Sequence, residues 1–157
     1  MKLIYLLGSK IFSFLRKGHH HENKKNFEIN FKNSCSHLGR NTKFFKTERM
    51  KLGNNLFIGD NVMINCGKGG TVTIGDNTSL AEGVKILSWY KDSLPSFPDN
   101  VIKKDVIIGR YCRIGYNAII MPGVTIGDFC KISPSSVVYN DVPSKGLAMG
   151  NPAQIIK

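Results

Sequence analysis

The sequence has 157 residues, a formal net charge of +11 and 41% hydrophobic residues. This length and composition allow one domain with a modest core. The charge is unevenly placed, because residues 1–51 carry 12 basic and 3 acidic residues, whereas residues 52–157 carry 10 and 8. The basic character therefore belongs to the N-terminal third of the chain.

Residues 1–17 predict a short amphipathic helix, with apolar side chains on one stripe and polar ones opposite. The stripe consists of Ile4, Leu7, Ile11, Phe14 and Leu15. Two interpretations stay open: residues 1–17 make a peripheral membrane contact on an anionic surface, or they pack against protein. The segment is too short and too charged to span a bilayer, and Lys10 interrupts the apolar run that a signal peptide needs.

The stretch from Gly18 to His37 reads as a polar linker. Its three adjacent histidines hold no fixed geometry, so we expect no metal site there. The chain then divides into residues 1–37, a helix with its linker, and residues 38–157, a single folded domain. Leu38 and Phe44 have the spacing of the first side of that domain.

A large aliphatic residue returns every six positions in the C-terminal half. These residues are Ile108, Ile114, Ile120, Ile126, Ile132 and Val138. Such short units cannot bury their apolar side alone, so they stack, and a six-residue period is the signature of a parallel β-helix. With three sides of six residues, residues 18 apart become vertical neighbours about 4.8 Å apart. The sequence predicts an all-β triangular solenoid.

The same spacing extends backward with two interruptions. Twelve sides give about four coils and three apolar columns: Leu52, Ile74, Ile108 and Ile126 on a first face; Ile58, Leu80, Ile114 and Ile132 on a second; Ile64, Ile86, Ile120 and Val138 on a third. Both insertions, the residues 67–70 and the loop 87–107, follow a side of the third face. We therefore expect both to project from one corner of the prism, one coil apart.

The four cysteines do not form a disulfide framework. Cys112 and Cys130 are 18 residues apart, so they are expected to stack at an inward corner, whereas Cys35 and Cys66 lie elsewhere. We interpret all four as free thiols in a reducing cytosol.

Residues 52–157 resemble the hexapeptide-repeat acyltransferases, which include serine, maltose, galactoside and xenobiotic acetyltransferases. Residues 103–109 resemble the return from the family's loop, Met-Pro-Gly-Val-Thr-Ile-Gly at 121–127 its central coil, and Gly-Asn-Pro-Ala at 150–153 its ending. The resemblance implies a left-handed β-helix acyltransferase domain over residues 38–157, acetyl-CoA as co-substrate and a homotrimer. The general crossover rule alone would give a right-handed coil.

The family's catalytic base is a histidine in a run resembling Ile-Leu-Ser-His. Here Trp89 stands at that position, and no histidine follows His37. An indole is not a base, so the open substitutes are Asp92 or Asp99 in the loop, Glu82 on the preceding side, and His37 from a folded-over or neighbouring N-terminal segment. Trp89 itself is suited to stacking on a sugar ring or to packing the loop down.

The resemblance also implies a cofactor cleft between two subunits. The matching positions are Gly115, Tyr116, Ser133, Pro134, Asn140 and Lys157. Asn140 stands where the family often has lysine, which weakens the charge available for the cofactor.

Other functions of this fold fit less well. A zinc enzyme needs histidines on the coils, and residues 38–157 contain none. A nucleotidyltransferase needs a nucleotide-binding domain with a Gly-rich loop, which residues 1–51 lack. We expect acetyl transfer to a sugar hydroxyl or amine in bacterial surface polysaccharide synthesis, in the cytoplasm or at the inner membrane face, with no nucleic acid partner. The alternative is a catalytically impaired trimeric scaffold in glycan assembly.

Overall fold

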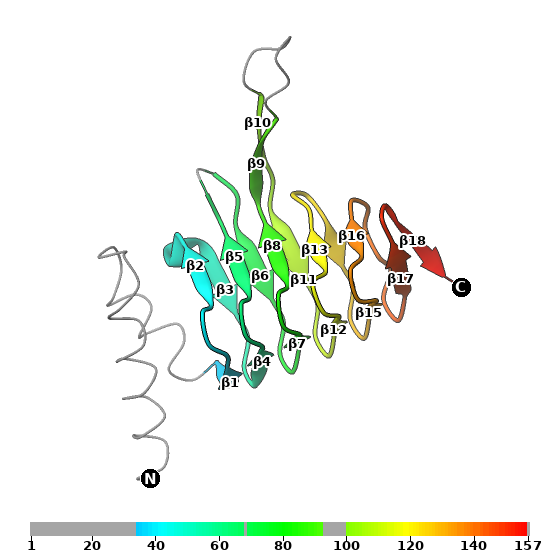
Figure 1. The fold of residues 1–157 in the computed structure, drawn as a ribbon, viewed down its shortest axis with the longest axis horizontal. Coiled ribbons are helices and arrows are strands. Elements are labelled where there is room, and N and C mark those ends of the chain that lie inside the picture. Colours follow the sequence, from blue (N-terminus) through cyan, green and yellow to red (C-terminus); the bar gives the residue numbers. More distant parts are fainter. Residues whose placement is uncertain (1–33, 68, 93–99, 157) are drawn as a thin grey trace.

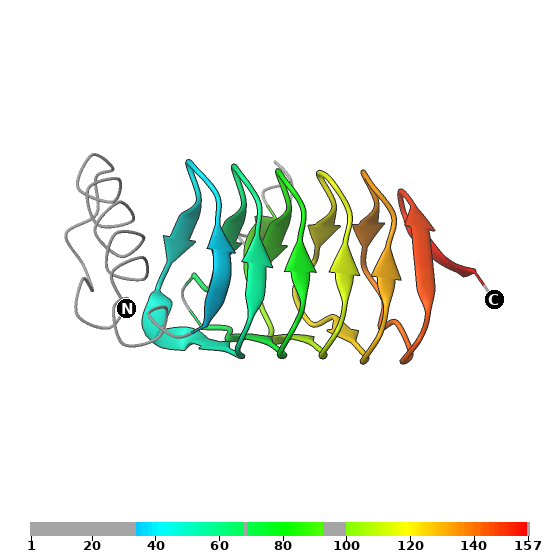
Figure 2. The same ribbon diagram turned by 90° about the horizontal axis from the view of Figure 1, so that it is seen from below.

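The residues of the six-residue period build the three faces of a parallel β-helix. The computed structural model describes residues 34–67, 69–92 and 100–156, so the predicted helix of residues 1–17 lies outside the described residues. Strands of successive coils lie side by side along the long axis of the molecule (Figures 1 and 2). No helix in the described part of the chain is long and apolar enough to cross a membrane.

Each face is a stack of short strands from successive coils. The first face holds β3 (Met50–Leu52), β6 (Val72–Ile74), β11 (Val106–Ile108) and β14 (Thr125–Ile126). The second holds β1 (Cys35–Leu38), β4 (Leu56–Ile58), β7 (Ser79–Leu80), β12 (Arg113–Ile114), β15 (Lys131–Ile132) and β17 (Leu147–Gly150). The third holds β2 (Lys43–Phe45), β5 (Met63–Asn65), β8 (Lys85–Leu87), β13 (Ile119–Ile120) and β16 (Val137–Val138). A last strand, β18 (Ala153–Ile156), folds back antiparallel on β17.

The strand register confirms the three predicted columns. Ile74 pairs with Leu52 and Ile108 on the first face, and the other two faces repeat this pattern through Leu80 and Ile86. Apart from the partly buried Leu52, these aliphatic side chains are almost fully buried and fill the interior of the prism. Burying each one contributes about 1.5–3 kcal/mol, so the stacked columns are the main source of stability.

The solenoid begins before Leu52. Leu38 pairs with Ile58 and Phe44 pairs with Ile64, which confirms that both belong to the columns. The spacing from Phe44 to Leu52 is longer than six because a short 3₁₀ turn, Thr47–Arg49, occupies the corner between them. Because of this turn, a strict six-residue period does not detect the additional coil that precedes Leu52.

The corners of the prism place one residue per turn in the left-handed backbone region. Asparagine occupies five of these positions: Asn41, Asn55, Asn61, Asn77 and Asn117 have φ between 54° and 58°. Asparagine tolerates this conformation better than most residues. Tyr111 and Phe129 occupy two further positions, and their rings stack with centroids 5.1 Å apart.

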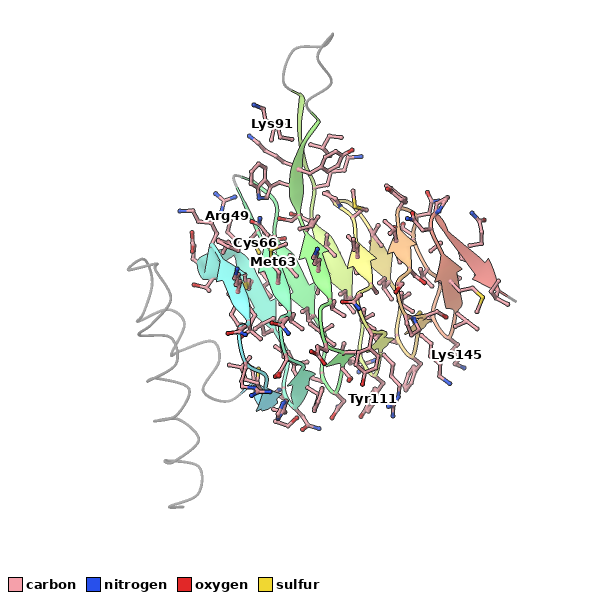
Figure 3. All side chains as sticks on the ribbon, viewed as in Figure 1. Arg49, Met63, Cys66, Lys91, Tyr111 and Lys145 are labelled. Carbon is pink, nitrogen blue, oxygen red and sulfur yellow. The ribbon has the colours of Figure 1, made fainter. Side chains whose placement is uncertain are left out.

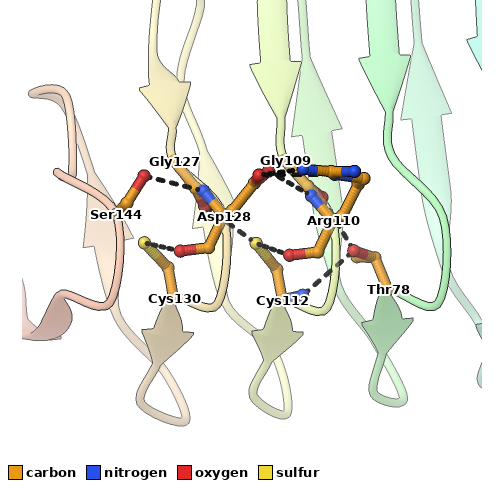
Figure 4. Close-up of polar contacts among 8 residues, drawn as sticks. All are labelled: Thr78, Gly109, Arg110, Cys112, Gly127, Asp128, Cys130 and Ser144. Atoms are coloured by element: carbon orange, nitrogen blue, oxygen red, sulfur yellow. Dashed lines mark hydrogen bonds and ion pairs between the residues drawn. The ribbon is translucent and has the colours of Figure 1, made fainter.

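The cysteines lie as predicted. All four are free, and Cys112 and Cys130 are buried at successive levels of one corner. The Sγ atom of Cys112 donates to the carbonyl oxygen of Gly127 at 3.0 Å (Figure 4). The Sγ atom of Cys130 donates to the carbonyl oxygen of Pro143, also at 3.0 Å. Burial also raises the pKa of the Cys66 thiol to about 12. These thiols therefore act as small core residues.

An ion pair joins two coils at the corner between the first and second faces. Asp128 accepts the backbone N–H of Arg110 at 2.8 Å, and its second oxygen accepts from the guanidinium at 2.9 Å (Figure 4). The backbone N–H first, and the guanidinium next, hold the pKa of Asp128 below its ordinary value. The charged carboxylate is therefore the form that ties the two coils together.

This arrangement predicts a loss of stability in acid. A carboxyl group with a lowered folded pKa stabilises the protein above its unfolded pKa of about 3.9, and that contribution disappears as pH falls through the folded pKa. We expect the unfolding midpoint of Asp128→Asn to lie below that of the wild type at pH 6, with the gap closing below about pH 4. Thermal melts from pH 2 to 7 check this, with exposed Glu82→Gln as control. A gap that is constant with pH would contradict the assignment.

Candidate functional site

Two insertions meet at the corner between the third and first faces. The first follows β5 and spans residues 66–71. The second follows β8 and forms a hairpin of β9 (Trp89–Asp92) and β10 (Asn100–Lys103). Figure 1 shows the hairpin rising from the side of the solenoid beside the shorter loop. The prediction that both leave one corner is confirmed by the order of the strands.

Trp89 is fixed at the base of the hairpin. Its indole Nε1 donates to the side-chain oxygen of Asn65 at 2.8 Å, and the backbone N–H of Gly67 donates to the same oxygen at 3.0 Å. The ring lies so close to Gly67 that an added Cβ there would be 1.6 Å from Cδ1 of Trp89. Trp89 thus connects the hairpin to the shorter loop, and it stays half-buried.

The other candidate bases lie in different places. His37 is exposed on β1 and stacks on Phe57 with ring centroids 4.6 Å apart, at the opposite side of the solenoid from the hairpin (Figure 1). Glu82 is exposed at the corner between the second and third faces, where it accepts from Asn61 at 3.3 Å. Asp92 ends β9, but its side chain lies outside the described residues, as does Asp99. Within one chain, the structure does not bring His37 or Glu82 to Trp89.

A shallow groove on the second face collects four predicted cofactor residues. Gly115, Tyr116, Ser133 and Pro134 line it, and its volume is about 370 Å³. Arg113 and Lys131 extend from adjacent coils into the same lining, together with apolar Leu147. The lining formed by the described residues contains two cations and no carboxylate. Such a groove fits an elongated ligand with anionic groups and an apolar stretch.

Two predicted cofactor residues do not join this groove. Asn140 lines a separate pocket of about 210 Å³ at the C-terminal end of the solenoid, with Val138, Val142 and Ala148 on one side and residues of β18 on the other. Lys157 lies outside the described residues. Among the residues that the structure describes, no group of three or more His, Cys, Asp or Glu side chains could hold a metal ion.

The repeat region matches a known family. Residues 105–140 fit the family model described as bacterial transferase hexapeptide (six repeats). The hexapeptide repeat of this family is therefore present over those residues. Solved neighbours of the chain include a galactoside acetyltransferase in complex with coenzyme A, with a TM-score of 0.76, 24% identity and coverage of 99% of this chain and 80% of that one.

Two curated relatives are more similar to this chain in sequence over a shorter span. Nodulation protein L of Rhizobium meliloti (strain 1021) is 43% identical over 89 residues, which cover 54% of this chain and 47% of that protein. The polysialic acid O-acetyltransferase of Escherichia coli O1:K1 / APEC is 44% identical over 91 residues, which cover 55% and 29%. The chain thus spans about half the length of the first relative and less of the second.

Sequence reasoning missed three residues of the candidate site. Asn65 was not predicted as the partner of Trp89, although both insertions were placed at one corner, and that placement was the available signal. Arg113 and Lys131 were not predicted as lining residues. Their spacing of 18 residues was the signal for them, because outward side chains 18 apart stack just as inward ones do.

Proposed function

We propose that this protein transfers an acetyl group from acetyl-CoA to a hydroxyl or amine of a sugar in bacterial surface polysaccharide synthesis. The groove on the second face is the observation that carries the proposal. It gathers Gly115, Tyr116, Ser133 and Pro134, and it adds the cations Arg113 and Lys131. The phosphates of an acyl-CoA suit those cations, and its extended arm suits a groove that runs across several coils.

The names of similar proteins support the same chemistry. The solved galactoside acetyltransferase holds coenzyme A, and one curated relative is an O-acetyltransferase of polysialic acid. We assign to the coil the left hand of the family, and to the assembly a homotrimer in which the groove of one subunit faces the hairpin of the next, because within one chain the second face and the hairpin lie on opposite sides of the solenoid. A cytoplasmic location, with residues 1–17 touching the inner membrane face, belongs to the same proposal.

The reaction requires the acceptor oxygen or nitrogen to attack the thioester carbonyl. The new C–O or C–N bond forms, the C–S bond breaks, the thiolate of CoA leaves, and the acceptor proton passes to a base. Trp89 cannot take that proton, because its Nε1 is a donor and is bonded to Asn65. We infer a slow transfer that relies on binding and orientation of the two substrates, with water or a partner-subunit group as the proton acceptor.

The bond between Trp89 and Asn65 also favours one alternative function. The indole of Trp89 occupies the family's base position and ties down the hairpin, which is what a binding protein without catalysis would retain. A trimeric scaffold in glycan assembly is therefore the second candidate. It differs from the first in a single property, turnover of bound acetyl-CoA in the presence of a sugar.

Titration with acetyl-CoA tests the groove. We expect saturable binding in the micromolar to millimolar range, and a Kd about tenfold weaker for Lys131→Glu, since the change replaces an attraction to phosphate by a repulsion. Lys145→Glu makes the same charge change at a corner outside the groove lining and should leave the Kd unchanged. Calorimetry supplies both values. Equal Kd values for the two variants would remove the groove as the donor site, and no binding by the wild type would favour the scaffold.

A further inference from the structure

The hairpin presents lysines and an aromatic ring on one side. Trp89 pairs with Lys103, and Lys91 pairs with Val101. Directly paired residues of antiparallel strands project to the same side, and so do alternate residues along a strand. Trp89, Lys91 and Lys103 therefore share one side of the hairpin, and Tyr90 and Ile102 share the other. Lys91 is visible on the hairpin in Figure 3.

Two glycines of the shorter loop hold this side in place. Gly67 lies under the ring of Trp89, and an added Cβ at Gly69 would lie 2.7 Å from Cδ of Lys103. The stem of Lys103 thus lies along the loop beside the indole, and the residue remains exposed. The side chain of Lys104 extends toward the next coil instead. An added Cβ at Gly123 of that coil would lie 2.8 Å from Cδ of Lys104. The two lysines bracket the base of the hairpin.

Two carboxylates along this corner, Asp105 and Asp141, accept hydrogen bonds from backbone N–H groups. Asp105 accepts the N–H of Thr71 at 2.8 Å, and Asp141 accepts the N–H of Thr125 at 2.7 Å. Both acidic side chains are therefore directed at the solenoid backbone, whereas Lys103 and Lys104 are exposed. Lys103 and Lys104 consequently present positive charge to a ligand that approaches Trp89.

We propose that the acceptor is a saccharide carrying a negative charge, bound with its ring against Trp89 and its anionic group between Lys103 and Lys104. This inference rests on the proposed function, because it names the substrate class of that reaction. The indole offers an apolar face to the C–H groups of a sugar ring, while its Nε1 is engaged by Asn65. The ammonium groups select a carboxylate or a phosphate over a neutral hydroxymethyl group.

Matched pairs of acceptors test the proposal on the full-length protein. Methyl glucuronoside is compared with methyl glucoside, and glucose 6-phosphate with glucose, which separates carboxylate from phosphate recognition. Binding is followed by the fluorescence of Trp89, the only tryptophan in the chain. We expect at least one anionic sugar to bind about tenfold more tightly than its neutral partner at low salt, with the ratio falling as salt rises.

Substitutions assign the effect to the hairpin. Lys103→Met should reduce the tenfold preference to about threefold, and the double variant Lys103→Met/Lys104→Met should abolish it. Lys103→Arg keeps the charge and should keep the preference. Lys145→Met, at a corner away from the hairpin, should change nothing. A preference that survives the double variant, or no preference in the wild type, would overturn the proposal.

Failure of this inference can be told apart from failure of the proposed function. Acetyl-CoA binding and acetylation of the neutral sugars are measured in the same protein. If neutral sugars are acetylated and anionic ones have no advantage, the substrate class is wrong and the reaction stands. If anionic sugars bind through Lys103 while acetyl-CoA does not bind, the sugar site stands and the reaction is wrong.

Discussion

Replacing Trp89 with histidine is expected to raise the rate of acetyl transfer about 10²-fold, the lower end of what general-base catalysis contributes. Asn65 supplies the physical reason. Its side-chain oxygen, which now accepts from the indole Nε1 at 2.8 Å, would accept one imidazole N–H instead. The other ring nitrogen would then carry the lone pair, as a base requires.

The pH dependence separates a new base from a general repair of the site. A histidine base should give a rate that rises through an inflection near pH 6.5, because only neutral imidazole accepts the proton. Trp89→Phe is the matched control, since it removes the Nε1–H donor without adding a base, and the Gly67 N–H still bonds the Asn65 oxygen. Equal rates for the two variants would show that position 89 does not face the reacting proton. Steady-state assays with a sugar acceptor give both rates.

The sequence was sufficient to place the core because one strict period controls it. Every inward column from Leu52 to Val138 was predicted in its correct register, since successive layers are 18 residues apart except where one of the two insertions lengthens the offset. The first coil broke the period through the 3₁₀ turn at Thr47–Arg49, so spacing alone detected only Leu38 and Phe44 there. The position of that coil is given by the pairing of β1 with β4 and of β2 with β5. This pairing is seen only in the folded chain and not in the spacing of the sequence.

The site was less predictable because its contacts join segments without a period. Trp89 and Asn65 are 24 residues apart, and the inserted loop makes that separation differ from 18. The break in the period identified residues 67–70 as an insertion, but it did not indicate that position 67 must lack a side chain for the indole to fit. By contrast, Gly115, Tyr116, Ser133 and Pro134 lie on regular coils, and the structure places all four in the lining of one groove.

Gly67→Ala is expected to be the most destabilising single-methyl change near the site. Gly67 has a φ of 43°, and its added Cβ would lie 1.6 Å from Cδ1 and 1.9 Å from Nε1 of Trp89. The ring must therefore leave its place and lose the bond to Asn65. A backbone conformation unfavourable to alanine, combined with a displaced half-buried indole, costs on the order of 3 kcal/mol. This corresponds to a drop in Tm of about 6–12 °C for a chain of this size.

Gly69→Ala is the matched control two residues away. Its Cβ would meet Cδ of Lys103 at 2.7 Å, and a flexible lysine stem moves aside at little cost. We expect its Tm to stay within about 2 °C of the wild type, and the emission spectrum of Trp89 to shift in Gly67→Ala alone. Thermal melts and fluorescence spectra measure both. Similar melts for the two variants would mean that the indole does not lie against Gly67, and the hairpin would then need another anchor at its base.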